Sequence, residues 1–328
     1  MQALVTGGTG FAGSHLVRRL LQRGDSVRVL DSKEGCFSSE LRHRGAEIRL
    51  GTITDRCIVE EAVEGCDVVF HLAAAFRELK VRKRHYWEVN VEGTRNVADT
   101  CLRLGTRKLV YCSTQGVHGN VQSPPGSEES PVAPEDYYQY TKYEGEVVIN
   151  EYVERGLCAV TLRPTAIYGP GDPARFLKLF RVVNQGRFLM FGRGTTYYHP
   201  VHIDNLVDAF ELAAEPAAPG SGEAFIIGDD QFWSLNDLVR HVARALNRKV
   251  RITYAPFWPL YTAACVCEAA CAPIRIAPPL FRRRVNWFRQ DRAFSIQKAR
   301  SELNYTPRIS IDEGLVETGR WYRDNNYL

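Results

Sequence analysis

A glycine-rich segment near the start of the chain, TGGTGFAG at residues 6–13, constrains the fold most. It follows a short apolar run and opens a segment of helical length, so it forms a turn between a strand and a helix. Gly7, Gly10 and Gly13 have the spacing GxxGxxG. The first glycines let the backbone turn tightly and approach a pyrophosphate, and Gly13 lets helix and sheet pack closely. The turn therefore predicts a unit that holds phosphate groups at a helix N-terminus.

Short β-rich runs alternate with helix-length segments over the first half of the chain. The runs lie at residues 2–7, 26–31, 46–51, 66–73, 107–113 and 158–164. This alternation predicts an α/β fold, a Rossmann-type doubly wound parallel sheet whose ligands bind at the carboxyl ends of the strands. The looser pattern after residue 164 indicates a smaller, mixed C-terminal lobe. We expect residues 1–165, with 201–228 returning, to bind a dinucleotide, and residues 166–200 and 229–328 to bind substrate.

Two aspartates are candidates for recognition of an adenosine. Asp31 ends the second run, where a carboxylate can accept both ribose hydroxyls of the nucleotide. Because it would repel a 2′-phosphate, NAD is favoured over NADP, and Lys33 weakens this preference only slightly. Asp55, in the segment GTITD, is placed to receive the adenine amino group, but a helix N-cap explains it equally well.

The segment YYQYTKYEGE, residues 137–146, surrounds one lysine with tyrosines. In a helix, Lys142 lies over Tyr138, four residues earlier, and not over the other tyrosines. A positive charge beside a phenol favours the phenolate, so this pair could act as a general acid and base near neutral pH. A helix with packed tyrosines and a solvated lysine explains the same ten residues.

A series of motifs in order resembles those of the extended short-chain dehydrogenases/reductases, the NAD-dependent epimerase/dehydratase superfamily. The likeness covers essentially the whole chain, and the C-terminal part is similar to the 3β-hydroxysteroid dehydrogenase branch. Besides the glycine turn, Asp31 and Asp55, the motifs are HLAA (71–74), NVEGTRNV (90–97), STQGVHG (113–119), Tyr138-x-x-x-Lys142, LRPTAIYGPGD (162–172) and VHIDNLVDA (201–209).

The resemblance implies a catalytic set. Tyr138 would be the acid/base, and Lys142 would bind the nicotinamide ribose and lower the pKa of the tyrosine. Thr114 would bind the reacting oxygen, with Ser113 as the neighbouring candidate, and Asn90 would be the active-site asparagine. The residues expected to contact NAD are Gly7, Gly10, Phe11, Gly13, Asp31, Ile53, Asp55, Leu72, Ala73, Ala74, Tyr138, Lys142, Pro164 and Ile167.

Departures from the family pattern narrow the reaction. The dehydratases carry adjacent Asp and Glu where this chain has Gln115 and Gly116, so elimination of water by that route is not expected, and neither is decarboxylation that uses the Glu. His118 replaces a frequent tyrosine and either packs or contacts substrate. Tyr197 stands where nucleotide-sugar enzymes place an arginine for the diphosphate, a contact that a phenol cannot replace. The arginines that could compensate are Arg193, Arg289 and Arg292.

Three functions stay open at this point. The first is an NAD-dependent dehydrogenase that acts on a bulky, largely apolar secondary alcohol. The second is a nucleotide-sugar epimerase that oxidises and re-reduces one carbon with retained NAD. The third is a protein that senses NAD without turnover, against which the complete set of Thr114, Tyr138 and Lys142 argues.

Composition limits location and partners. Nine cysteines without a secretory leader indicate reduced thiols and a cytoplasmic protein, and no metal site is expected, because Cys265, Cys267 and Cys271 lack further ligands at suitable spacing. A net charge of +4 does not suggest binding of nucleic acid, and the basic run 77–85 is either a solvated helix face or an electropositive rim for an anionic ligand.

The apolar stretch 255–267 is too short to span a bilayer. Residues 254–281 could pack in the core, roof a pocket or rest on a membrane. Helices near 86–104 and 136–154 would pair in a homodimer, by resemblance.

Overall fold

A computed structural model describes residues 1–328 except 77–81, 173–174, 272, 274–275 and 277. Most of the basic run 77–85 lies outside the described residues, so its two interpretations stay open.

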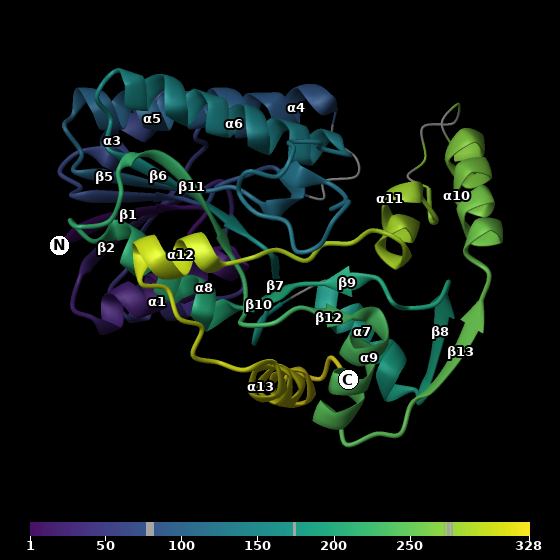
Figure 1. The fold of residues 1–328 in the computed structure, drawn as a ribbon. Helices are drawn as coiled ribbons and strands as arrows, with labels where there is room; N and C mark the ends of the chain where they lie inside the picture. Colours follow the sequence, from purple (N-terminus) through teal and green to yellow (C-terminus); the bar gives the residue numbers. More distant parts are fainter. Residues whose placement is uncertain (77–81, 173–174, 272, 274–275, 277) are drawn as a thin grey trace.

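The centre of the molecule is a seven-stranded parallel sheet (Figure 1). Its order is β11-β6-β5-β4-β1-β2-β3, so the direction of winding reverses between β1 and β4. In a doubly wound sheet this switch point opens the crevice in which a dinucleotide binds. The predicted fold class is confirmed. The strands are β1 (Gln2–Thr6), β2 (Ser26–Asp31), β3 (Glu47–Leu50), β4 (Val68–His71), β5 (Lys108–Cys112), β6 (Ala159–Pro164) and β11 (Ser221–Ile227).

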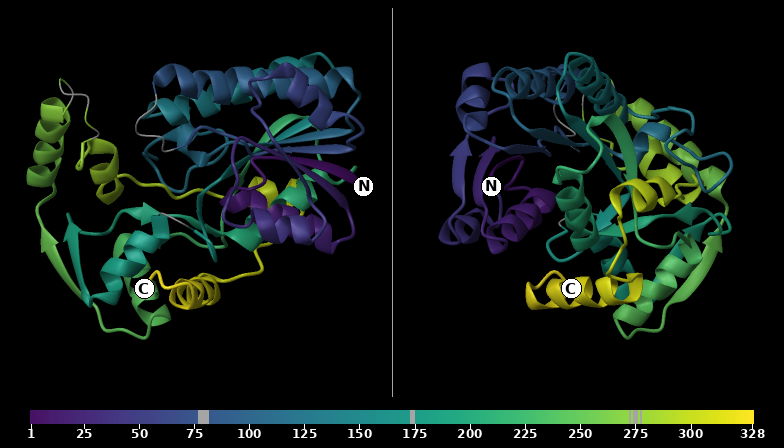
Figure 2. Two further views of the ribbon diagram at one scale, coloured as in Figure 1. Left: turned by 180° about the vertical axis from the view of Figure 1, so that it is seen from behind. Right: turned by 60° about the vertical axis from the view of Figure 1, so that its left-hand side comes forward.

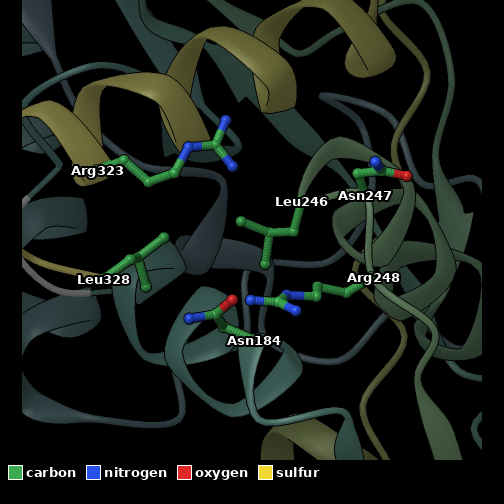
Figure 3. Close-up of a pocket in the computed structure, with 6 residues that line it drawn as sticks. All are labelled: Asn184, Leu246, Asn247, Arg248, Arg323 and Leu328. Atoms are coloured by element: carbon green, nitrogen blue, oxygen red, sulfur yellow. The ribbon is translucent and has the colours of Figure 1, made fainter.

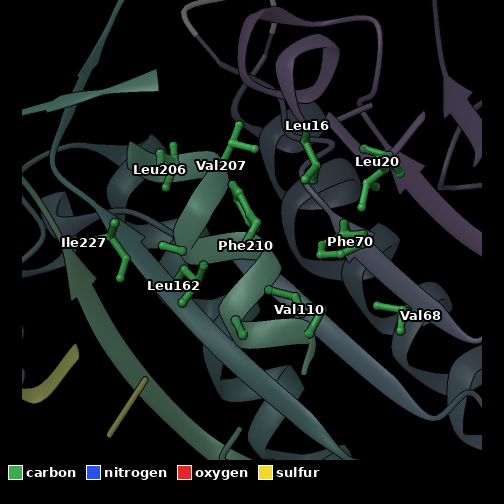
Figure 4. Close-up of a cluster of buried hydrophobic side chains, with 14 of the residues drawn as sticks. Leu16, Leu20, Val68, Phe70, Val110, Leu162, Leu206, Val207, Phe210 and Ile227 are labelled. Carbon is green, nitrogen blue, oxygen red and sulfur yellow. The ribbon is translucent and has the colours of Figure 1, made fainter. Parts of the chain in front are cut away.

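Helices cover both faces of the sheet, because its central strands are apolar on both sides. In β4, Val68 and Phe70 pack against α1 and α8, while Val69 packs against the opposite helices. Figure 4 shows Phe210 of α8 among the side chains of the first face. The helices on this face are α1 (Phe11–Gln22), α2 (Ser38–His43), α8 (Ile203–Ala214) and α12 (Gln297–Leu303). Those on the other are α3 (Arg56–Val63), α5 (Thr94–Arg103) and α6 (Tyr137–Glu154).

The smaller lobe has its own apolar core, built around helices α7 (Arg175–Asn184), α9 (Leu235–Ala245) and α13 (Ile311–Asp324). Three two-stranded sheets accompany these helices. They pair β7 (Ala166–Tyr168) with β10 (Pro200–His202), β8 (Arg187–Phe191) with β13 (Arg251–Ala255), and β9 (Tyr197–Tyr198) with β12 (Trp233–Ser234).

Helix α12 departs from the expected division of the chain. The range 229–328 was expected to belong to the smaller lobe, but Ala299 and Leu303 pack into the core of the main sheet. The helix has seven residues, too few for its apolar pattern to indicate which core it joins.

Helix α10 (Phe257–Cys271) and the short helix α11 (Arg282–Val285) form an arm at the end of the smaller lobe (Figures 1 and 2). Ala264 is the one buried residue of α10, whereas Trp258 and Val266 are each 63% exposed. Packing in the core, one of the three expectations for residues 254–281, is therefore wrong for this helix. Among the described residues, no helix is both long and apolar enough to cross a membrane.

Short helical turns complete the chain. They are α4 (Lys83–Trp87), the π-helix η1 (Glu88–Gly93), and the 3₁₀-helices η2 (Gln115–His118) and η3 (Asn286–Phe288). Two of them, η1 and η2, position candidate site residues.

Candidate active site

The glycine turn joins β1 to α1 and forms a cradle. Gly7 has a φ of +70°, and a Cβ at this position would lie 2.8 Å from the backbone nitrogen of Ala73. A Cβ on Gly13 would collide with the carbonyl oxygen of Gly7. Helix α1 begins at Phe11 with Gly10 as its N-cap and without a side-chain cap, so its first N–H groups lack intrahelical acceptors. The cradle therefore fits a pyrophosphate group.

Asp31, at the end of β2, lies beside this turn. Its Oδ2 atom accepts hydrogen bonds from the backbone nitrogen of Thr9 at 3.1 Å and from the Thr9 hydroxyl at 2.6 Å. Both bonds end on one oxygen and hold the carboxylate next to the cradle. Sequence reasoning did not single out Thr9, although it stands inside the glycine motif.

Asp55 caps helix α3. Its Oδ1 atom accepts from the backbone nitrogens of Cys57 at 3.0 Å and Ile58 at 3.3 Å. The structural explanation given for Asp55 is thus confirmed, while its contact with adenine stays a prediction. Ile53, two residues earlier, is buried, and its carbonyl oxygen accepts from Asn96 at 3.0 Å.

The segment after β4 lies against the glycine turn. The backbone nitrogen of Leu72 donates to the carbonyl oxygen of Thr6 at 3.1 Å, and that of Ala73 donates to the Thr6 hydroxyl at 3.2 Å. Residues 72–74 therefore follow the carboxyl end of β4 at the switch point. Pro164 ends β6, and Ile167 lies in β7, where it pairs with Val201 of β10.

A buried histidine supports this edge of the sheet. His71 is 0% exposed, its Nδ1 atom lies 2.7 Å from the Thr6 hydroxyl, and its Nε2 atom lies 3.0 Å from the Thr94 hydroxyl. Since the Thr94 hydroxyl donates to the carbonyl oxygen of Asn90, Nε2 carries the hydrogen of the imidazole. Burial, with the charge of Lys142, lowers the pKa of His71 to about 3, so the ring is neutral. His71 is the first residue of the motif HLAA, but sequence reasoning gave it no role of its own.

Helix α6 carries the Tyr138 and Lys142 pair. The Lys142 side chain is only 1% exposed, its Nζ atom lies 4.1 Å from the centre of the Tyr111 ring, and it has no hydrogen-bond partner among the described residues. The alternative of a solvated lysine is therefore wrong. Burial lowers the pKa of Lys142 to about 8. The Tyr138 ring is half-buried and lies 4.9 Å from the ring of Phe76.

Ser113 and Thr114, which follow β5, have different surroundings. Ser113 is buried and donates a short hydrogen bond to Glu146. Thr114 is partly exposed and caps η2 by accepting from the backbone nitrogen of Gly116 at 3.1 Å, which does not use its hydroxyl hydrogen. Thr114 is therefore better suited than Ser113 to bind a reacting oxygen.

Asn90 lies in η1 and is fully buried. Its Oδ1 atom accepts from the backbone nitrogen of Ala75 at 2.8 Å, and its Nδ2 atom donates to the Thr141 hydroxyl at 3.0 Å. These bonds connect the segment after β4 to helix α6 at Thr141, the residue before Lys142. Single π-helical turns are frequent at functional sites. The hydrogen bonds of Asn90 thus position the backbone at Ala75 and the side chain of Thr141.

His118 belongs to the packing of the site. Its Nδ1 atom donates to the carbonyl oxygen of Ser130 at 3.0 Å, and its Nε2 atom accepts from Arg163 at 3.0 Å. Burial lowers the pKa of His118, and the charge of Arg163 adds to this effect. The packing interpretation is confirmed. Gln115, at the position of the dehydratase aspartate, is also buried.

Two other features, a hollow and a cluster of possible metal ligands, lie outside this region. A hollow of about 420 Å³ lies where helices α7, α9 and α13 end (Figure 3), and none of the predicted site residues lines it. The side chains of His202, Asp204 and Glu317 lie close enough to share an ion. However, Nδ1 of His202 accepts from the backbone nitrogen of Asp204 at 3.3 Å, so Nε2 presents a hydrogen to Glu317 rather than a lone pair.

Comparisons with known proteins agree with this geometry. The pattern of the "NAD dependent epimerase/dehydratase family" matches residues 3–228. A 2-alkyl-3-oxoalkanoate reductase from Stenotrophomonas maltophilia is 32% identical over 326 residues, covering 96% of this chain and 97% of that protein. A 3 beta-hydroxysteroid dehydrogenase/Delta 5-->4-isomerase from Mycobacterium tuberculosis is 31% identical over 340 residues, covering 98% of this chain and 90% of that protein.

Among solved structures, a UDP-glucose 4-epimerase with UDP-glucose from Thermotoga maritima superposes with a TM-score of 0.80 at 25% identity. The match covers 99% of this chain and all of that chain. The protein is an NAD-dependent enzyme of the extended short-chain dehydrogenase/reductase type, similar to the 3β-hydroxysteroid dehydrogenases, and it belongs to the NAD-dependent epimerase/dehydratase family.

Proposed function

We propose that the enzyme transfers hydride between NAD and a bulky, largely apolar secondary alcohol or its ketone, with Thr114, Tyr138 and Lys142 as its working groups. The observation that carries this proposal is the buried Nζ atom of Lys142, one helical turn from Tyr138 and without a hydrogen-bond partner among the described residues. An unpartnered buried ammonium is costly. The ribose hydroxyls of a bound NAD would supply the missing partners.

The residues present fit NAD. The glycine cradle and the first turn of α1 would hold its pyrophosphate, Asp31 its adenosine ribose and Lys142 its nicotinamide ribose. When bound, NAD supplies the hydride acceptor. The other residues that are predicted to contact NAD, among them Phe11, residues 72–74, Pro164 and Ile167, are proposed to line the same site.

The protein's own groups would handle the proton. The hydroxyl of Thr114 would hold the substrate oxygen, and Tyr138, as phenolate, would take the alcohol proton. The ammonium of Lys142 would favour that phenolate by its charge. In the reverse direction Tyr138 would return the proton. Gln115 and Gly116 offer no carboxylate, which supports simple hydride transfer over elimination.

The surroundings of the arginines support an apolar substrate over a sugar diphosphate. Arg292 donates to the Gln290 side chain at 2.7 Å and lies 3.8 Å from the Glu135 carboxylate. Arg289 lies 5.5 to 5.9 Å from the centres of three aromatic rings at the start of α10. Two of the three arginines that could replace the missing diphosphate ligand are thus engaged, and the exposed apolar side chains of α10 are available to a hydrophobic molecule.

A nucleotide-sugar epimerase is the second candidate, favoured by the likeness to the UDP-glucose 4-epimerase. A panel of hydroxysteroids, other bulky apolar alcohols and nucleotide sugars tests both functions. NADH formation, read by nicotinamide absorbance, is expected with apolar alcohols, with weak binding of UDP- and dTDP-sugars. Interconversion of two sugar-nucleotide epimers without net NADH would replace the first proposal by the second.

We further propose that residues 1–165 and 201–228, with α12, form the NAD-binding domain, and that the rest of 166–328 binds substrate. The supporting observation is that α8, β11 and α12 share the core of the main sheet. Substitutions in this substrate-binding part should then change which alcohol the enzyme accepts, while those in the NAD-binding domain should not.

The proposed assembly is a cytoplasmic homodimer that touches membranes through α10. Nine free cysteines support a reducing compartment. The exposed side chains of Tyr140 and Val147, seven residues apart on α6, offer an apolar strip on which a second copy of the chain could pack. Trp258 and Val266 could enter a lipid surface. Sedimentation with and without anionic vesicles tests both: a monomer rules out the dimer, and protein that stays in the supernatant rules out membrane contact.

A further inference from the structure

A buried ion pair lies beside the proposed catalytic groups and has no part in the chemistry described so far. Arg163 binds Glu146 through two hydrogen bonds, at 2.6 Å and 3.0 Å. The two side chains are only 8% and 5% exposed. A buried pair of charges with this bidentate geometry is strong, but either charge would be very unfavourable without the other.

The pair connects three elements that carry the site. Glu146 lies on α6 one turn after Lys142, and it also accepts from Ser113, the residue before Thr114. Arg163 lies in β6 directly before Pro164. The network therefore fixes the end of β5, the face of α6 and the end of β6 relative to one another.

Glu146 also acts on Lys142 by its charge. Burial is the main cause that lowers the pKa of Lys142, and Cys112 and Glu146 oppose it. Glu146 is the one carboxylate among these influences, and Arg163 and Ser113 hold it in place. The titratable groups around the lysine, on α6 and on the strands packed against it, are Glu146, Tyr138, Tyr111, Cys112 and His71.

We propose that Glu146 is a positioning residue: its carboxylate, held by Arg163 and Ser113, keeps the Lys142 ammonium charged and in place for NAD and Tyr138. This inference rests on the proposed function of Lys142. Without the carboxylate, the buried ammonium loses its proton at a lower pH, and NAD binding fails earlier as the pH rises.

The test is the pH dependence of NAD affinity, measured by calorimetry, and of kcat/KM in Glu146→Gln. The amide keeps the shape of the side chain and removes its charge. We expect the alkaline limb of both profiles to move down by about one pH unit. A merely structural role predicts lower stability with the limb unmoved. Glu128→Gln is the matched control, because Glu128 is a half-buried carboxylate that also lies near Arg163 and accepts from the backbone nitrogen of Ile226, but it is not among the charges that act on Lys142 and should leave the limb in place.

A second variant covers the case in which Glu146→Gln leaves Arg163 uncompensated and the chain does not fold. Replacing both, as Glu146→Gln with Arg163→Met, removes the two buried charges together. This variant should fold and move the limb in the same direction, by less than the single variant because the positive charge of Arg163 is removed as well. If it, or a folded single variant, keeps the wild-type limb, the inference is overturned. If Lys142→Met binds NAD as the wild type does at every pH, the proposed function itself fails.

Discussion

Among single residues, Tyr138 is the one on which the proposed reaction depends most. Its hydroxyl is assigned to proton transfer, while its ring packs near Phe76. Replacing Tyr138 by Phe should lower kcat by about 10²-fold or more, since a positioned acid/base contributes this much. The Kd for NAD should stay nearly unchanged, because the shape of the ring is kept. Tyr140→Phe, on an exposed part of the same helix, serves as the control. Turnover at the wild-type rate in Tyr138→Phe would remove Tyr138 from its role.

Lys142 makes a prediction about stability as well as binding. Its pKa falls from 10.5 to about 8 on folding. Below pH 8 this lowers the free energy of unfolding of the protein without NAD by about 3 kcal/mol. The unfolded chain therefore binds more protons between pH 8 and 10.5, and wild-type stability rises with pH in this window. Lys142→Met should abolish that rise, stabilise the NAD-free protein near pH 7, and weaken both NAD binding and turnover.

Thermal unfolding from pH 6.5 to 10, with and without NAD, measures these effects of Lys142. Two results would contradict the assignment. One is a variant that is less stable than the wild type at pH 7 without NAD. The other is a variant that NAD stabilises as much as it stabilises the wild type.

At the scale of secondary-structure elements, the end of β2 should decide between the two dinucleotides. Asp31 is held beside the cradle by Thr9, and its charge would repel a 2′-phosphate. Asp31→Ala should reduce the preference for NAD over NADP by about tenfold, the effect of losing one charged hydrogen bond. The ratio of kcat/KM for the two cofactors measures the change. A wild-type enzyme that uses both equally at equal concentration would refute this assignment.

Elements were predictable from sequence where their pattern is local. The six runs of the main sheet, the glycine turn and helix α1 follow from apolar periodicity and turn residues, whereas helix α6 was expected from the family resemblance. Contacts between distant segments were not predictable: nothing in the sequence shows that Glu146 meets Arg163 and Ser113, or that Thr6 and Thr94 enclose His71. Helix α10 is apolar on all sides, so its sequence offers no polar face from which to infer that it stands apart from both cores.

For the molecule as a whole, the proposed reaction is net hydride transfer from an alcohol to NAD. The most direct test uses the best alcohol of the substrate panel, deuterated on its carbinol carbon, with unlabelled NAD. Nuclear magnetic resonance of the products shows where the deuterium goes. We predict one deuterium on the nicotinamide ring for each ketone formed. Deuterium that returns to the carbon with inverted configuration, without ketone or net NADH, would rule out net hydride transfer.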